Sequence, residues 1–136
     1  MSSRLCRWVF LAAFPGAALP AAADEVVCRY SYGGETRTLV ARAVASPYGV
    51  PAVAVGSYFQ FRVVFQKEPA DLASIKVYTY ADLDSGATPI HQATYPYPPP
   101  AVPDDRHGFT GLHFVYEPMR DGELQYWCKL REDGRG

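Results

Sequence analysis

Three histidines and one methionine are the side chains of this sequence best suited to binding a metal ion. They are His91, His107, His113 and Met119, all in the second half of the chain. Imidazole and thioether groups suit copper ions, and a loop His107 beside a strand His113, with Met119, is the group that could converge. None of them belongs to a His-x-His or Met-x-x-Met cluster. The first expectation is therefore no cofactor, and copper binding is the alternative.

The acidic residues form no complete catalytic or calcium pattern. Asp82, Asp84 and Gly86 have the spacing that opens a calcium loop, but the third ligand and the distal Glu of the EF-hand pattern are absent, which favours an acidic turn. The carboxylates of residues 104–107 fall in a polar loop without a fixed partner. The chain also contains no Gly-x-Ser-x-Gly elbow, the turn that carries the nucleophile of many hydrolases. The sequence predicts a protein that is not an enzyme.

Tyrosine is the residue type that a hydrophobic core does not explain. The chain has ten tyrosines; Tyr95 and Tyr97 stand among the prolines of residues 95–103, and Tyr78 and Tyr80 alternate along a predicted strand. Tyrosine offers a rigid amphipathic surface that is enriched at protein interfaces, and a stiff Pro-rich segment loses little entropy on docking. We expect a non-catalytic binding or accessory protein whose partner is another protein.

Two other interpretations of the same residues stay open. The prolines could instead cover a sheet edge against aggregation. Tyr78, Tyr80, Tyr97 and Trp127 could also form an aromatic wall for a sugar or an apolar molecule, which would make the protein a small-ligand carrier. A concave pocket would favour the carrier, and a flat aromatic patch would favour a protein partner.

Residues 1–23 have the features of a secretory signal. Arg4 and Arg7 precede an apolar run, and small residues before Asp24 suit signal peptidase. The run is too short to span a bilayer as a helix, so no membrane span is expected after cleavage. Cys6 is removed with the signal. We expect a periplasmic or secreted protein. The assignment to the periplasm assumes a Gram-negative source.

The two remaining cysteines predict one disulfide. Cys28 and Cys128 form an even pair in an exported chain, and two cysteines allow only one pairing. They lack the Cys-x-x-Cys arrangement of redox sites.

The net charge of the chain argues against nucleic acid as a partner. The whole chain carries a formal net charge of −1, and the signal removes two of its basic residues. Without a basic stripe, no nucleic acid is expected as a partner.

Period-2 alternation between turn signals predicts an all-β domain over residues 24–131, followed by a flexible tail at 132–136. About seven strands fit an immunoglobulin-like two-sheet β-sandwich. Within it, the segment 53–65 has the clearest apolar face and is expected to be one central strand, bent near Gly56. The strands are expected at about residues 26–32, 35–44, 53–65, 73–81, 88–95, 109–116 and 124–130.

The first and last strands have matching apolar faces. Tyr126-Trp127-Cys128 resembles the Tyr-x-Cys of an immunoglobulin strand F, although this chain has almost nothing before Cys28 and ends shortly after Cys128, so membership of that family is not inferred. The two faces are expected to meet in one core, either as paired strands or across the sandwich. They consist of Val26, Cys28, Tyr30 and Tyr32 in the first strand and Leu124, Tyr126, Cys128 and Leu130 in the last.

Overall fold

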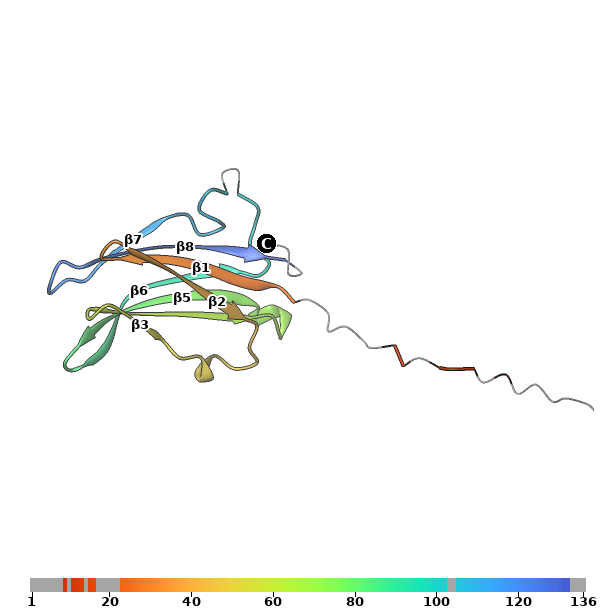
Figure 1. The fold of residues 1–136 in the computed structure, drawn as a ribbon. Helices are drawn as coiled ribbons and strands as arrows, with labels where there is room; N and C mark the ends of the chain where they lie inside the picture. The colour runs from red at the N-terminus through yellow and green to blue at the C-terminus, as the bar shows by residue number, and fades with distance from the viewer. Residues whose placement is uncertain (1–8, 10, 14, 17–22, 103–104, 133–136) are drawn as a thin grey trace, which may run out of the picture.

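The computed structural model describes residues 9, 11–13, 15–16, 23–102 and 105–132. These residues form two antiparallel four-stranded sheets in the order β2-β1-β8-β7 and β3-β4-β5-β6, and Figure 1 shows the sheets as two stacked layers. The strands are β1 (Glu25–Tyr32), β2 (Glu35–Arg42), β3 (Val53–Val55), β4 (Phe59–Gln66), β5 (Ser74–Leu83), β6 (Gly86–Pro96), β7 (His113–Tyr116) and β8 (Glu123–Arg131). Two short 3-10 helices, η1 (Pro47–Gly49) and η2 (Ala70–Leu72), lie in the connections.

The predicted signal lies mostly outside the described residues, as does most of the predicted tail, at positions 133–136. Pro103 and Asp104 of the Pro-rich loop also lie outside them. None of the helices in the described part of the chain is both long and apolar enough to cross a membrane.

The topology places the two ends of the domain in the middle of one sheet. Strands β3 to β6 follow one another as a meander, whereas the other sheet is built from the β1–β2 and β7–β8 hairpins, which join where β1 pairs with β8. The chain therefore changes sheet twice, after β2 and after β6. At the first change, the Val44 amide donates a 2.9 Å hydrogen bond to the Phe65 carbonyl of β4.

The disulfide joins these two central strands. Cys28 lies directly opposite Cys128 in the β1–β8 register, with 4.0 Å between their Cα atoms, so the predicted bridge is confirmed. Its position differs from that of an immunoglobulin domain, where the bridge connects the two sheets. Here it ties neighbouring strands of one sheet.

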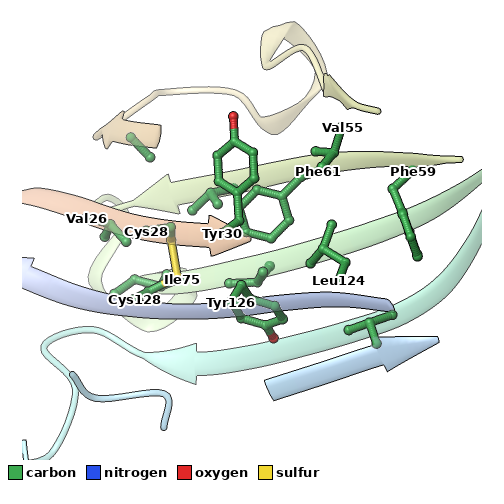
Figure 2. Close-up of a cluster of buried hydrophobic side chains, with 14 of the residues drawn as sticks. Val26, Cys28, Tyr30, Val55, Phe59, Phe61, Ile75, Leu124, Tyr126 and Cys128 are labelled. Atoms are coloured by element: carbon green, nitrogen blue, oxygen red, sulfur yellow. A yellow bond between two sulfur atoms is a disulfide. The ribbon is translucent and has the colours of Figure 1, made fainter. Parts of the chain in front are cut away.

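The core lies between the sheets and is formed by the faces that alternation predicted. Cys28, Tyr30, Leu124 and Tyr126 are buried, and Phe61 of β4 contacts both tyrosine rings at centroid distances of 5.2 and 5.3 Å. Figure 2 shows these side chains filling the space between the two sheets beside the disulfide. The prediction that the first and last strands share one core is confirmed, with the strands paired.

The expectation of one central strand over residues 53–65 was wrong. The segment is a hairpin in which β3 pairs with β4, and Val55 lies opposite Phe59. Gly56, at φ 57°, occupies the left-handed backbone region that the turn requires. Because Val55 and Phe59 are four positions apart, both keep the same face, and a period-2 pattern continues unchanged through the turn. The described residues of the sandwich therefore form eight strands.

The predicted strand 109–116 is also shorter than expected, since β7 begins at His113. The preceding residues instead run along the edge of β8 as a loop. Gly108 forms an isolated parallel bridge with Cys128, the Phe109 amide donates to the Cys128 carbonyl at 3.0 Å, and the Thr110 hydroxyl accepts from the Cys128 amide at 2.9 Å. Side-chain alternation resembles that of a strand, but the hydrogen bonds are those of a docked loop.

Candidate functional site

Two histidines and two tyrosines meet between the sheets, where the edge strands β6 and β7 face each other. His91 Nε2 lies 2.6 Å from the Tyr126 hydroxyl, and His113 Nε2 lies 3.2 Å from the Tyr95 hydroxyl. His91 and Tyr95 come from β6, His113 from β7 and Tyr126 from β8. In Figure 2 the Tyr126 hydroxyl points toward the side of the sandwich where β6 and β7 lie. We call these four residues the His–Tyr cluster.

The rings of the His–Tyr cluster are stacked as well as hydrogen-bonded. His113 lies parallel to Tyr126, with 4.9 Å between centroids and 10° between planes, and the centroids of His91 and His113 are 5.4 Å apart. His113 Nε2 also lies 3.0 Å from the Thr110 carbonyl oxygen, which only accepts. That nitrogen therefore carries the hydrogen in the neutral ring.

Burial controls the protonation of the His–Tyr cluster. It lowers the pKa of His91, and the nearby His113 lowers the pKa of His91 further, so this imidazole is neutral at pH 7. Burial raises the pKa of Tyr126, with a further contribution from Tyr95. Burial also raises the pKa of Tyr95, against a smaller lowering by its hydrogen bond with Tyr126. His91, Tyr95 and Tyr126 therefore act as uncharged donors and acceptors at pH 7.

The structure does not bring together the three residues suggested by sequence as copper ligands. His107 contacts Trp127 at 5.9 Å, whereas His113 stacks on Tyr126. Trp127 and Tyr126 are consecutive residues of β8 and point to opposite faces, so the two histidines lie on opposite sides of that sheet. Met119 is 75% exposed in the turn after β7. Within the described ranges, no three His, Cys, Asp or Glu side chains form a group able to hold a metal ion.

Two of the predicted partner-binding tyrosines face inward. Tyr95 and Tyr97 are half-buried against the hydrophobic core. The Tyr97 ring lies 4.9 Å from that of Phe65, and its hydroxyl donates to the Asp24 carboxylate. These two tyrosines therefore close the sandwich near the Pro-rich loop, and the surface that they leave to a partner is limited.

The other two predicted tyrosines, Tyr78 and Tyr80, share the outer face of β5. Their rings stack at 6.2 Å, and the Arg62 guanidinium lies 5.1 Å from the Tyr78 ring centroid. Trp127 is on the outer face of the other sheet, and Tyr97 is tucked inside. The alternative of an aromatic wall is therefore contradicted, because Tyr78 and Tyr80, Tyr97 and Trp127 occupy three different places in the sandwich.

The β7 edge is a surface that sequence reasoning missed. Phe114 and Tyr116 are 51% and 59% exposed on the outer face of β7. Val115 between them is buried and anchors the strand. Leu112 and Met119, on either side of the strand, are also exposed. The signal in the sequence was a run of large apolar residues on both faces of one short strand.

A groove of about 560 Å³ opens at the opposite edge, between β2 and the segment that follows η1. Its walls are mainly aliphatic, and Arg42 is the only charged residue that lines it. The lining residues include Leu39, Val40, Ala41, Val50, Val53 and Val63. It contains none of the aromatic residues expected of a sugar carrier.

Comparisons of this chain with protein-family models, with curated proteins and with solved structures found no match. The functional argument therefore depends on the geometry of the described residues. Two places have unusual chemistry or exposure: the His–Tyr cluster inside the sandwich and the aromatic β7 edge outside it. They lie on opposite faces of β7, because His113 and Val115 point inward while Phe114 and Tyr116 point outward.

Proposed function

We propose that this chain is an exported, non-catalytic binding protein that engages a partner protein through the edge of β7. The observation that carries the proposal is the difference between β7 and the other three sheet edges. A free edge offers unpaired backbone amides and carbonyls to another chain, and proteins protect such edges with charges, prolines or very short strands.

Three of the four edges have such protection. Edge strand β2 carries Glu35, Arg37 and Arg42, and β6 contains Pro89 and Pro96. The third edge strand, β3, has only three residues. Strand β7, with the sequence His-Phe-Val-Tyr, contains neither a proline nor an acidic or basic residue other than its histidine. It lies at the end of its sheet, and none of the described strands pairs with its outer edge.

The side chains of β7 suit a protein partner. Phe114 and Tyr116 point outward beside the free backbone edge, and exposed aromatic residues are enriched among those that carry binding energy at interfaces. An added strand from a partner would form backbone hydrogen bonds with β7, while these two rings would select the partner's side chains. The tyrosine content predicted a protein partner, and the proposal keeps that prediction. The proposed contact surface is β7 instead of Tyr95 and Tyr97.

Export is supported by the disulfide and by the first residues of the sequence. A bond between Cys28 and Cys128 persists in an oxidising compartment such as the periplasm or the extracellular space. Residues 1–23 have the charged start, apolar run and small residues of a secretory signal. The proposed partner is therefore another protein of that compartment.

Site-specific photo-crosslinking in living cells tests this function. A photoreactive amino acid replaces Phe114, and the matched control replaces Val40, which is 44% exposed on the other edge of the same sheet. We expect position 114 to give one discrete adduct with a second protein, identified by mass spectrometry, and position 40 to give none. Adducts only with a second copy of the chain, or equal adducts at both positions, would contradict the proposal.

Substitution of the same residue measures the strength of the interface. Phe114→Arg is expected to weaken binding of the partner identified by crosslinking about 30-fold, the equivalent of the roughly 2 kcal/mol that a central aromatic residue contributes to an interface. Val40→Arg is the control and should leave the affinity unchanged. Equal affinities of both variants, measured by titration calorimetry, would place the interface elsewhere.

A further inference from the structure

The aliphatic groove between β2 and the segment that follows η1, here called the β2 groove, is concave and large enough for a small molecule. Its volume of about 560 Å³ lies within the range of roughly 300–1,000 Å³ of small-molecule sites. We propose that it binds one fatty acid, with the alkyl chain in the groove and the carboxylate at Arg42. The site is separate from the partner-binding surface, because β2 and β7 are the opposite edges of one sheet.

The floor of the β2 groove belongs to the core of the sandwich. Ala41 of β2 and Val63 of β4 line it, come from different sheets and are only 8% and 2% exposed. The groove therefore enters the space between the two sheets. Leu39 of β2 and Val53 of β3 lie half-buried along it. An alkyl chain placed here extends the hydrophobic core, and each methylene that leaves water strengthens binding about threefold to fourfold.

The outer wall of the β2 groove is held in place by hydrogen bonds to β4. Arg62 of β4 donates from Nε to the Val50 carbonyl at 2.8 Å and from Nη2 to the Pro47 carbonyl. The Val44 amide, which donates to the Phe65 carbonyl, fixes the start of the same connection. Figure 1 shows this connection as a loop outside the two layers. The groove is therefore formed in the free protein, and little ordering entropy is lost when a ligand enters.

Arg42 gives the β2 groove its preference for an anionic head group. Its side chain is 82% exposed, so it lies at the rim, and its Nε donates to Glu25 at 3.3 Å. Its two Nη groups donate to none of the described residues. Glu25 also pairs with Arg131, so these three side chains carry two positive charges and one negative charge, a net charge of +1. A carboxylate that accepts hydrogen bonds from the Nη groups balances this charge.

The β2 edge suits an alkyl chain better than a peptide. An added peptide strand would lie along β2, where the charges of Glu35, Arg37 and Arg42 protect the edge from pairing. The backbone amides and carbonyls of a peptide would also need hydrogen-bond partners, which the aliphatic lining does not offer. An alkyl chain has no such groups and needs only apolar contact.

Titration calorimetry tests the site with dodecanoate below its critical micelle concentration. The protein is purified with its disulfide intact and freed of lipid on a hydrophobic resin, and the pH is one at which the fatty acid is ionised. We expect one equivalent to bind, with an affinity that rises from octanoate to decanoate to dodecanoate. Dodecanol, which has the same chain without the charge, should bind about two- to fivefold more weakly, the range of an exposed ion pair.

Three outcomes of these measurements would overturn the proposal. They are absence of binding, an affinity that does not change with chain length, and equal affinities of dodecanoate and dodecanol. Sedimentation of the lipid-free protein tests a different occupant: a dimer that dodecanoate dissociates would assign the groove to a second copy of the chain.

Two pairs of matched variants locate the ligand. Val53→Trp fills the groove and should weaken dodecanoate binding at least about tenfold, the equivalent of two methylenes left in water. Its control is Ala54→Trp, at the next residue of β3, which is exposed on the opposite face. Circular dichroism checks that both variants fold. Equal affinities of the two variants would refute the site.

The second pair tests the head group. Arg42→Ala should weaken dodecanoate binding about two- to fivefold and leave dodecanol binding unchanged. Arg37→Ala is the control, since Arg37 is also an exposed arginine of β2 that pairs with a glutamate at 3.3 Å, and it should bind both ligands like the wild type. Equal losses in the two variants, or a loss of dodecanol binding in Arg42→Ala, would refute the role of Arg42.

Discussion

At the scale of single residues, Gly108 sets the path of the loop that leads to β7. Its backbone has a φ of 63°, and a Cβ atom built on it would lie 2.0 Å from the Cys128 carbonyl oxygen. The loop can therefore lie against β8 only because this residue has no side chain. The same contact positions Phe109 and Thr110 along the strand edge, and through them the start of β7 with His113.

Gly108→Ala should destabilise the protein more than the matched substitution Gly33→Ala. Gly33 has nearly the same backbone angle, φ 61°, but no atom lies within 4 Å of its added Cβ. Gly33→Ala should lower the free energy of unfolding by about 1–2 kcal/mol from the left-handed backbone alone. Gly108→Ala should lose about 1–3 kcal/mol more, because its methyl group overlaps a backbone carbonyl. Urea unfolding measures both, and equal losses would mean that the loop can move away from β8.

At the scale of elements, the turn between β7 and β8 is organised by a buried carboxylate. Glu117 is fully buried and accepts hydrogen bonds from the Met119 amide at 3.0 Å, the Arg120 amide at 2.7 Å and Arg120 Nε at 3.1 Å. Arg120 in turn lies 3.9 Å from the Tyr58 ring centroid and donates to the Asp82 carbonyl of β5. The turn thereby connects the β7–β8 hairpin to the other sheet.

The stability that Glu117 contributes should depend on pH. Burial alone raises the pKa of this carboxyl, but the hydrogen bonds from Met119 and Arg120 outweigh it and hold the pKa below its ordinary value of 4.5. A carboxyl with a lowered pKa stabilises the fold fully above its unfolded pKa, and this stability is lost as pH falls through the folded pKa. Glu117→Gln should therefore have a lower urea midpoint than the wild type at pH 7.

Below about pH 4.5 the midpoints of the wild type and Glu117→Gln should approach each other, since protonation removes the charge that the variant already lacks. Urea unfolding from pH 7 to pH 3 measures the difference. Other acidic residues titrate alike in both proteins and cancel in the comparison. A difference that stays constant over this range would show that the charge of Glu117 contributes nothing to the turn.

At the scale of the whole molecule, the disulfide and the β1–β8 pairing hold the two ends of the domain together. The cysteines are 100 positions apart in sequence, so the bond closes almost the entire domain into one loop. An ion pair between Glu25 at the start of β1 and Arg131 at the end of β8 lies on the same pair of strands. Unfolding of either terminal strand therefore disrupts the centre of a sheet instead of its edge.

Loss of the disulfide should lower the free energy of unfolding by roughly 4–5 kcal/mol, the chain-entropy estimate for a loop of this length. The comparison is between the oxidised protein and the Cys28→Ala/Cys128→Ala variant in denaturant. Reductant added to the wild type should give a similar loss, and reductant added to the variant should change nothing. A loss below about 1 kcal/mol would mean that the bond hardly restricts the unfolded chain.

The sequence alone determined the local features of this protein. Alternation between apolar and polar residues identified the faces of β1, β5 and β8, because each strand residue points to the opposite side from its neighbour. The pairing of Cys28 with Cys128 also followed from the sequence, since no third cysteine remains in the predicted mature chain. These predictions needed no knowledge of which strands lie side by side.

Tertiary structure decided the features that depend on strand order and on which side chains meet between the two sheets. Alternation could not detect the hairpin at Gly56, because a turn between residues four positions apart preserves the pattern. It placed Tyr126 inward, but only the packing of β6 and β7 against β8 brought His91 and His113 to it. Likewise, β7 is an edge because none of the described strands lies beyond it. Such relations join residues far apart in sequence, and they depend on packing between strands and between the two sheets, which local alternation does not encode.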